Sequence, residues 1–589
     1  MKRIGMKGEG KFKRISWDKA LKEIVSRMKE IIRKYGPQAI LHYEYAGHCG
    51  LLNYYFPLRF FNAIGASSIQ HKICDSAGEE AIALHYGLRY GSFPKDILKS
   101  KMIVLWGINS AWTNLHGYTL VLKAKRNGAK IYVIDPVKTK TSKIGTHLRP
   151  KVGSDAALAL GVANYIIENN LYDEEFVEKY TFGFEKFKKH VKSFTLDKVS
   201  KITGLSKEEI INFAEDHANL KPNIIHIGYG MQRHLNGGEM VRAICLLPVL
   251  IGLHRGYIYC NGVRDFDIDY LAGKNLRKIP ERKMNMVQLG KFLKSGEIKM
   301  IFIYGANPLV TLPNQNLVRE AFQQEDLFVV VHDIFKTETA DYADILLPAT
   351  TFFETIDIHV SYWHEYISIN EKAIEPLGEA KSNVELFKLL ARYMGLKENE
   401  LYEDEWEIIR NILAKSKMID FTLEELRSKG FAKLKTFPKD EYQIPSGKIE
   451  FYSQKAKQRG LNPLPEHVEI EGKYPICLLT PRHRDILGSQ FRNVMPSFEP
   501  IIEISVEDAA ERNINDGDIV TVYNDLGEVT LKAKISDRVP KGVALAYAFI
   551  KNMKGKCINI LTIDETQIYG GCSTFNSTFI EIRSKTNSM

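Results

Sequence analysis

The sequence predicts an α/β protein made of two doubly wound dinucleotide-binding-like domains and a small C-terminal β-barrel. Two observations predict this fold class. Short apolar runs that end in small or polar residues are typical of strands buried on both faces of a parallel sheet, and they alternate with segments of helical periodicity. Beyond about residue 470 the pattern changes to short strands separated by turn residues, which is typical of a barrel.

Length and composition limit the possible function classes. The chain has 589 residues, 44% of them hydrophobic, which is enough for several domains with large cores. Its net charge of +10 includes no long basic run, so nucleic-acid binding is not indicated. The apolar run at residues 243–253 is too short for a transmembrane segment and predicts a buried helix. The N-terminus lacks the apolar core of a signal peptide, so the chain as written is expected in the cytoplasm.

The cysteines form no recognisable framework. There are seven, an odd number, and none belongs to a Cys-x-x-Cys pair. Neither a disulfide framework nor a zinc or iron-sulfur motif is therefore present in this sequence.

Domain structure is expected to begin at Ser16, which can cap a helix with apolar residues at helical spacing. Residues 39–44 then predict a buried strand, and a glycine-bearing turn follows at residues 45–50. The next helix carries an aromatic cluster that we interpret as core: Tyr54, Tyr55, Phe56, Phe60 and Phe61.

A first dinucleotide-binding unit is predicted from the strands at residues 101–107 and 130–134. Gly107 would let the backbone approach a phosphate, and Asn109 could donate to it. Asp135 could accept two N–H bonds from a guanine. A lone glycine or aspartate at a strand end is weak support for this interpretation. Gly153 and Asp155 follow shortly afterwards.

A strand at residues 222–227 leads into a loop that contains Gly228, Gly230 and Arg233. Flexible glycines beside polar and basic side chains favour anion binding. Arg233 is equally well interpreted, from its sequence alone, as a solvated surface residue.

A second unit is predicted between residues 300 and 354. Residues 300–304 form a buried strand that ends at Gly305 and Asn307, and a further apolar run precedes Asp333. Asp333 suits a guanine contact, although a helix cap is the alternative. The two units imply two nucleotide-like sites related by approximate symmetry, and a cofactor with two dinucleotide arms would occupy them.

The segment at residues 333–354 contains the runs Thr-Glu-Thr-Ala, Ala-Asp-Ile-Leu-Leu-Pro-Ala and Phe-Glu. With these motifs the sequence resembles the molybdopterin oxidoreductase family, of the dimethyl sulfoxide reductase type. The resemblance covers nearly the whole chain. It implies a bis-molybdopterin guanine dinucleotide cofactor with molybdenum or tungsten, and a barrel of the double-psi type.

The resemblance also implies a division of the chain. Residues 1–14 would be the remnant of a junction with an iron-sulfur domain, and residues 470–589 the dinucleotide-binding barrel. The first α/β domain would combine residues 15–145 and 330–462, and the second would span residues 146–329. The 4Fe-4S cluster expected for the family has no ligands in this chain. A truncated gene, a mis-called start and a cluster domain on another polypeptide all stay open, and a lost leader would permit export.

The resemblance places a set of residues against the two dinucleotides. They are Gly107, Asn109, Asp135, Thr139, Gly153, Asp155, Gly228, Gly230, Arg233, Gly305, Asn307, Asp333, Thr480, Arg482, Ser489, Gln490 and Asn559.

The resemblance implies that the metal ligand and catalytic residue lies within residues 65–81, where Cys74, Asp75 and Ser76 are adjacent. We favour Cys74 because a thiolate is a soft ligand, and Lys72 would favour its deprotonated form. A small buried cysteine is the alternative. No histidine follows Cys74, which disfavours formate as the substrate.

The predicted function is that of a molybdenum or tungsten oxidoreductase catalytic subunit of the anaerobic respiratory type, acting on a small molecule. An iron-sulfur electron-transfer subunit is the expected partner. The alternatives are a non-catalytic scaffold subunit, a truncated inactive fragment, and a hydratase that uses the same cofactor without net redox. His359 and His364 are interpreted as structural rather than as substrate contacts.

Overall fold

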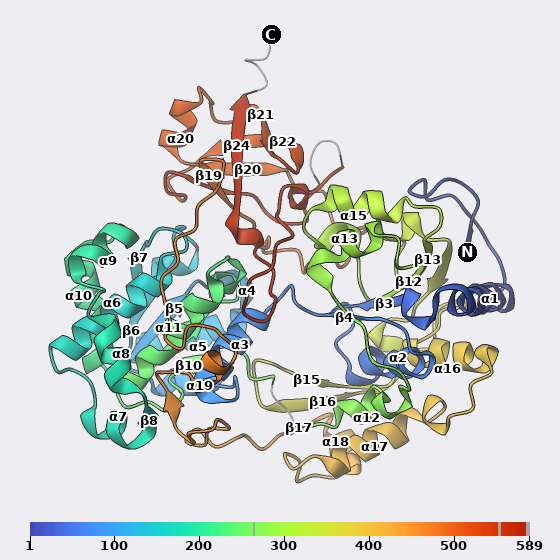
Figure 1. Ribbon diagram of the computed structural model, residues 1–589, viewed down its shortest axis with the longest axis horizontal. Coiled ribbons are helices and arrows are strands. Elements are labelled where there is room, and N and C mark those ends of the chain that lie inside the picture. The colour runs from blue at the N-terminus through green and yellow to red at the C-terminus, as the bar shows by residue number, and fades with distance from the viewer. Residues whose placement is uncertain (263–264, 552–554, 585–589) are drawn as a thin grey trace.

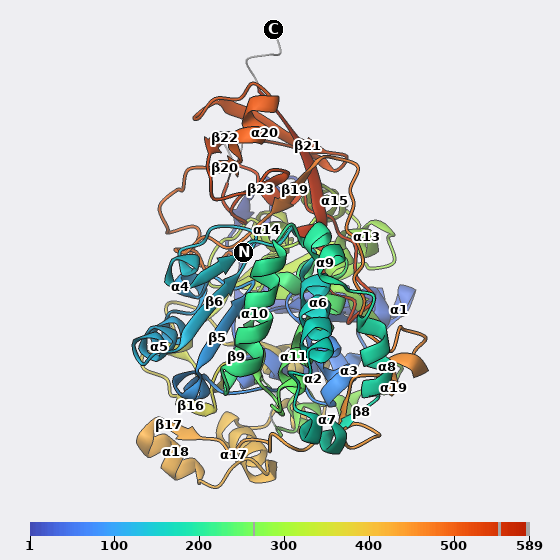
Figure 2. The same cartoon turned by 90° about the vertical axis from the view of Figure 1, so that its left-hand side faces the viewer.

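The protein is described by a computed structural model that covers residues 1–262, 265–551 and 555–584. Two α/β lobes lie side by side, and the C-terminal barrel sits above their junction (Figure 1). The view at right angles shows the same barrel above the lobes (Figure 2). The predicted fold class is confirmed: a mixed α/β fold with a closed barrel near the C-terminus.

The lobe that carries the N-terminus is built on a six-stranded sheet, here called the β12 sheet. Its order is β2-β1-β14-β13-β12-β3, and the four strands from β14 to β3 are parallel. The strands are β1 (Lys2–Arg3), β2 (Phe12–Lys13), β3 (Ile40–Glu44), β12 (Met300–Tyr304), β13 (Phe328–Asp333) and β14 (Ile345–Pro348).

The other lobe is built on a five-stranded, fully parallel sheet, here called the β5 sheet, in the order β10-β9-β5-β6-β7. Its strands are β5 (Met102–Trp106), β6 (Lys130–Ile134), β7 (Thr146–Leu148), β9 (Asn223–Ile227) and β10 (Tyr257–Ile258).

Strand order reverses once in each sheet. In the β5 sheet the chain runs from β5 outward through β6 to β7, whereas β9 and β10 lie on the other side of β5. In the β12 sheet it runs from β12 through β13 to β14, and β3 lies on the other side of β12. Such a reversal opens a crevice at the carboxyl ends of the two central strands, where open α/β sheets bind ligands.

The strand pairing differs from the predicted division into α/β domains. That division separates residues 102–134 from residues 223–258, yet β5 pairs with β9 along its whole length. It also assigns β12 to the second domain, although β12 pairs with β3 and β13. The strand pairing therefore groups these segments differently from the predicted division. All strands of the β5 sheet lie between β3 and β12 in the sequence. Periodicity along the chain does not reveal that one sheet is inserted into another in this way.

Helices cover both faces of each sheet. Against the β5 sheet, α3, α6, α10 and α11 fill one core and α5 the other. Against the β12 sheet, α1, α2, α16 and α17 fill one core and α13 and α15 the other. Their bounds are α1 (Trp17–Tyr35), α2 (Leu51–Ile64), α3 (Ser76–Tyr86), α5 (Leu115–Arg126), α6 (Asp155–Glu168), α10 (Lys207–Asn219), α11 (Gly237–Leu250), α13 (Leu289–Lys294), α15 (Gln315–Phe322), α16 (Asn383–Met394) and α17 (Glu405–Lys415).

Two helix predictions are confirmed. The Ser16 hydroxyl accepts a hydrogen bond from the Lys19 amide at 3.3 Å and so caps α1. Every residue of α11 is buried, as its apolar run predicts. In the described part of the chain, no helix is both long enough and apolar enough to cross a bilayer.

The barrel closes in the order β19-β23-β20-β22-β21-β24. Its strands are β19 (Ile476–Leu479), β20 (Ile501–Ile504), β21 (Ile519–Asn524), β22 (Gly527–Ile535), β23 (Val543–Leu545) and β24 (Thr578–Ser584). Sequence analysis missed β20, and it also missed a three-stranded antiparallel sheet below the two lobes. That sheet consists of β15 (Asp357–Val360), β16 (Tyr366–Asn370) and β17 (Phe431–Lys433).

Candidate active site

Paired glycines mark both switch points. Gly107 follows β5 with φ +64°, and a Cβ on Gly228 would lie 1.9 Å from the Gly107 carbonyl oxygen. Gly305 follows β12 with φ +57°, and a Cβ on Gly47 would lie 2.3 Å from the Gly305 carbonyl oxygen. No side chain fits at Gly228 or Gly47, so bare backbone lines each crevice.

Sequence analysis did not identify Gly47 as a site residue, because its close approach to Gly305 depends on β3 lying beside β12. Gly230 was predicted for the same crevice as Gly228, but its backbone is ordinary, with φ −61°. Its carbonyl oxygen accepts a hydrogen bond from the Asn576 side chain at 2.8 Å.

An asparagine–threonine pair braces each of these turns. The Asn109 Oδ1 atom accepts from the Thr141 hydroxyl at 2.7 Å, and the Asn307 Oδ1 atom accepts from the Thr339 hydroxyl at 2.6 Å. The backbone amides of the same threonines donate to the same oxygens at 3.4 and 3.3 Å. Both Oδ1 atoms are thus occupied, and the asparagine side chains are held in place at the carboxyl edge of each sheet.

The two turns repeat at a constant offset of 198 residues, which separates 107 from 305, 109 from 307, 135 from 333 and 141 from 339. Asp135 accepts from the Val137 amide at 2.9 Å, and Asp333 accepts from the Phe335 amide at 3.1 Å. Thr139 belongs to the same turn as Asp135 and Thr141. Its hydroxyl accepts a hydrogen bond from the Ser142 amide at 3.2 Å. The approximate symmetry is therefore a shared network of hydrogen bonds.

The carboxylates at these edges are desolvated. Burial raises the pKa of Asp135 to about 7 and the pKa of Asp333 to about 6. Asp155, at the start of α6, accepts from the Trp106 indole N–H at 2.7 Å, and burial raises its pKa to about 6. A ligand that donates hydrogen bonds would relieve this desolvation, because a carboxylate has more acceptor positions than these contacts fill.

Cys74 lies on the loop before α3 and is half-buried. The Arg233 guanidinium donates to the Cys74 carbonyl oxygen at 3.1 Å and approaches its Sγ atom at 3.5 Å. Burial raises the pKa of the Cys74 thiol, and the charge of Arg233 opposes this effect. The cation that contacts the thiol is thus Arg233, and the effect expected of Lys72 stays a prediction.

Arg482 is exposed, yet burial, followed by the charge of Arg233, lowers its pKa to about 9. The charges of Cys74 and Tyr45 also act on the pKa of Arg482, so this guanidinium lies near the Cys74 loop. The Arg482 guanidinium lies 3.9 Å from the centre of the Phe549 ring. Two cations therefore converge on the Cys74 loop.

The other candidate ligands on this loop are arranged differently. The carboxylate of Asp75 lies within 4.8 Å of donor atoms of Glu79 and Cys260, and Glu79 is paired with Arg89. Ser76 is buried, and its hydroxyl has no hydrogen-bond partner. Of the three residues, only Cys74 combines partial exposure with a guanidinium at its side chain.

The remaining predicted residues are dispersed around the crevices. Gly153 has φ +79° and its carbonyl oxygen accepts from Asn236 at 2.8 Å. Thr480 is buried at the end of β19, and Ser489 is half-buried in the segment 481–499. Gln490, in the same segment, donates to the Gly47 carbonyl oxygen at 3.3 Å, so the barrel reaches the β12 crevice.

Several buried polar atoms near the crevices have no partner within the described chain. They include Gln232 Nε2, Asn559 Oδ1 and Ser110 Oγ. Unpaired buried polar atoms are costly, so such a set indicates the place of a polar ligand. A dinucleotide cofactor fits this chemistry, because it offers phosphate acceptors to the glycine turns and purine donors to the carboxylates.

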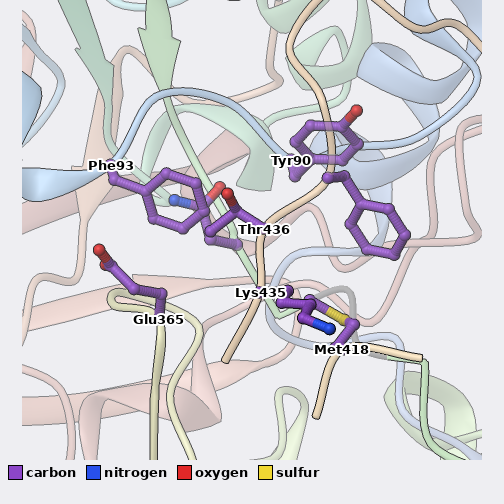
Figure 3. A pocket seen from close by; sticks show the side chains of 8 residues that line it. Tyr90, Phe93, Glu365, Met418, Lys435 and Thr436 are labelled. Carbon is purple, nitrogen blue, oxygen red and sulfur yellow. The ribbon is translucent and has the colours of Figure 1, made fainter. Parts of the chain in front are cut away.

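Two cavities accompany these features. The larger, about 180 Å³, lies between the β12 lobe and the barrel, and Glu338 and Arg492 are among its lining residues. The smaller, about 10 Å³, has room for one water molecule and is lined by Tyr90, Phe93 and Glu365 among others (Figure 3). No predicted site residue lines the smaller cavity.

Comparisons with known proteins agree with this geometry. Residues 1–393 match the family model for molybdopterin oxidoreductase, and residues 476–579 match the model for the molydopterin dinucleotide binding domain. The chain belongs to the molybdopterin oxidoreductase family. Its members are molybdopterin-dependent oxidoreductases, and the barrel is the part that matches the dinucleotide-binding model.

Individual relatives span almost the full chain. The probable oxidoreductase YoaE of Bacillus subtilis (strain 168) is 38% identical, over 99% of this chain and 89% of the relative. The dimethyl sulfoxide reductase DmsA of Haemophilus influenzae is 31% identical, over 95% and 83%. The solved structure of acetylene hydratase from Pelobacter acetylenicus superimposes with a TM-score of 0.85 at 22% identity, covering 99% of this chain and 91% of that one. At that identity the superposition shows a shared fold.

Proposed function

We propose that this chain is the catalytic subunit of a molybdenum or tungsten bis-pterin oxidoreductase that acts on a small substrate in anaerobic respiration. The observation that carries this proposal is the pair of equivalent crevices, 198 residues apart in sequence, together with Cys74 and the guanidiniums of Arg233 and Arg482 near it. A scaffold subunit would have no chemical use for a half-exposed thiol held beside a cation.

Each arm of the cofactor has its own set of residues. Gly107, Asn109 and Asp135 would hold one dinucleotide, and Gly305, Asn307 and Asp333 the other. The glycine turns offer backbone amides to phosphates, and the aspartates accept hydrogen bonds from guanine. When bound, the cofactor supplies the two-electron chemistry or oxygen-atom transfer.

Cys74 is the residue that we assign as metal ligand. Arg233 stabilises its thiolate form, because a cation at the Sγ atom opposes the effect of burial. Arg233 and Arg482 would also attract an anionic or strongly dipolar substrate to the Cys74 loop.

Elemental analysis of the purified protein for molybdenum, tungsten and iron tests this proposal. We expect about one molybdenum or tungsten per chain, as a site of matched ligands requires. Neither metal, in folded protein made in a cofactor-competent host, would overturn it in favour of the scaffold or inactive-fragment alternatives.

Substitutions distinguish the three candidate ligands. We expect Cys74→Ala to lose the protein-derived sulfur ligand, measured by X-ray absorption at the metal edge, while Asp75→Asn and Ser76→Ala keep it. An unchanged sulfur count in Cys74→Ala would refute the assignment.

We also propose that this chain exchanges electrons with an iron-sulfur subunit. Isolated protein should therefore turn over with an artificial dye as electron donor and not with a physiological carrier. Sustained turnover with a carrier alone would contradict this expectation.

A further inference from the structure

A buried carboxylate at the end of β3 is held between two histidines. Glu44 is 2% exposed, and its Oε2 atom lies 2.6 Å from His42 Nδ1. Its Oε1 atom lies 3.2 Å from His71 Nε2. Burial acts to raise the pKa of the Glu44 carboxyl, but His42 and His71 together hold it well below its usual range. Each oxygen of the Glu44 carboxylate thus lies within hydrogen-bond distance of an imidazole nitrogen.

The chain of contacts continues outward from His71. The Tyr54 hydroxyl lies 3.0 Å from His71 Nδ1, so the imidazole bridges a buried carboxylate and a phenol. The His71 side chain is 31% exposed, whereas His42 is 3% exposed. A proton on the buried pair thus has a path to an accessible imidazole edge. Tyr54, interpreted from sequence as core, takes part in this path.

This chain reaches the Cys74 loop. His71 and Cys74 are on one segment between β4 (Ser68–Gln70) and α3, three residues apart. The ring of Tyr45 lies 5.5 Å from the His71 ring. Burial, and next the charge of Cys74, raise the pKa of Tyr45 well above its usual range, which places this phenol beside both residues.

The fold does not require charged groups here. In the β5 sheet, Ile227 takes the register position beside Trp106 that Glu44 takes beside Tyr304. Ile225 likewise corresponds to His42, because each lies two residues earlier on the same strand. An equivalent strand thus packs with apolar residues at both positions.

Two other buried carboxylates have arginine partners, which stay protonated near neutral pH. Glu239 is paired with Arg242, and Glu503 with Arg538. A carboxylate held by two imidazoles is an arrangement that suits proton exchange, because the ordinary pKa of an imidazole lies in this range.

We propose that His71, oriented by Glu44 and hydrogen bonded to Tyr54, is the proton-exchanging group of this active site, and that His42 is the buried counterpart on the other oxygen of the Glu44 carboxylate. The inference rests on the proposed function. Reduction of a sulfoxide or amine N-oxide, XO + 2H⁺ + 2e⁻ → X + H₂O, consumes two protons. A reduced viologen dye supplies the electrons in the test below, and His71 would pass protons from solvent to a substrate at the Cys74 loop.

The groups that face His71 come from each neighbouring element. Glu44 and His42 are on β3, Tyr54 is on α2, and Tyr45 is on the turn after β3. Lys72, Cys74 and Asp75 follow on its own segment. Glu44 is the one anion among the described contacts of the ring, so its removal should act on His71 more than any other single change.

Nuclear magnetic resonance tests the chain without any cofactor. In apoprotein labelled with ¹³C-histidine, we expect Glu44→Gln to change the chemical shifts of the His71 imidazole, because the ring loses the carboxylate beside its Nε2 atom. The control, His116→Gln on the exposed surface of α5, should leave these shifts unchanged. Unchanged His71 shifts in Glu44→Gln would overturn the proposed pairing.

Turnover of the metal-loaded protein tests the role of His71 in proton exchange. With reduced methyl viologen and a panel of sulfoxides and amine N-oxides, His71→Gln should lower kcat by about 10²–10³-fold at unchanged metal content, as loss of a general acid does. Added imidazole should restore part of the rate. Full metal content with kcat within about twofold of the wild type would refute the role, since general acid catalysis is worth far more.

Failure of the proposed function can be distinguished from failure of the inference about His71. If wild-type protein loads neither metal, the proposed function fails and the role of His71 in it fails as well, whatever the resonance experiment gives. If the wild type loads metal and turns over but His71→Gln does so equally well, only the present inference is overturned.

Discussion

The two switch points share one backbone design but differ in the charged groups around it. Both have a glycine with positive φ, an asparagine braced by a threonine, and an aspartate that accepts one backbone amide. Around this frame the β5 edge adds Asp155, bonded to Trp106, whereas the β12 edge has Glu44 beside Tyr304. Position 140 is an exposed lysine, and its counterpart 338 is a partly buried glutamate.

The comparison separates the residues that a cofactor arm requires at both edges from the charged residues that are found at one edge only. The shared frame is what a dinucleotide arm needs, because phosphates and guanines present the same chemistry at either edge. The positions that differ have no such common purpose. We therefore expect substitutions in the frame to have similar effects at both edges, and substitutions outside it to affect one edge only.

The largest effect is expected at the paired glycines. Gly228→Ala and Gly47→Ala would each place a Cβ within 2.3 Å of a backbone oxygen, so both should destabilise the fold by more than the roughly 1–3 kcal/mol of ordinary overpacking. Thermal unfolding and metal content measure the result. Gly230→Ala is the matched control, because its Cβ would lie 4.0 Å from the Gly107 carbonyl oxygen. Equal stability of all three variants would contradict the close approach.

A smaller, symmetric effect is expected at the aspartates. Asp135→Asn and Asp333→Asn should each weaken guanine binding about 10–100-fold, since a charge-assisted hydrogen bond contributes about 1.5–3 kcal/mol. Calorimetric titration of apoprotein with GMP would measure this, with Asp197→Asn, an exposed helix residue, as the control. If only one of the two substitutions weakens GMP binding, the two edges do not hold equivalent arms of the cofactor.

The pH dependence of apoprotein stability should distinguish the same two residues. A raised folded-state pKa means that each carboxyl stabilises the fold below its unfolded pKa, about 3.9, and loses this contribution as the pH rises through its folded pKa. That value is about 7 for Asp135 and about 6 for Asp333. At pH 8 both asparagine variants should melt about 1–3 °C above the wild type, Asp135→Asn by more. A difference that persists at pH 4 would refute this explanation.

The smallest effect is expected where the edges differ in charge. Glu338 accepts from Asn307 at 3.1 Å and pairs with Arg492 and Lys551, each at 3.2 Å. Glu338→Gln should loosen the segment 481–499 and speed its cleavage by trypsin severalfold, because partly exposed ion pairs contribute about 1 kcal/mol. Lys140→Gln, its counterpart, should leave cleavage unchanged. Equal effects would mean that the charge at position 338 does not hold the barrel.

Sequence reasoning succeeded where a residue's role depends on its immediate neighbours. The apolar runs located β5, β6, β9 and β12 because burial on both faces leaves a local signal. The turn residues Gly107, Asn109, Gly305 and Asn307 follow directly from the ends of those strands. Gly230 shows the limit of the same argument, because a glycine in a loop gives no information on its own φ.

The sequence by itself determined the fold class, the family and the residue types at both crevices, because these depend on short segments that fold in a fixed local way. Tertiary structure decided which segments meet. It placed β3 beside β12 and so paired Gly47 with Gly305, brought Arg233 to Cys74, and set Glu44 between His42 and His71. Contacts between residues far apart in sequence depend on strand order, which no local pattern records.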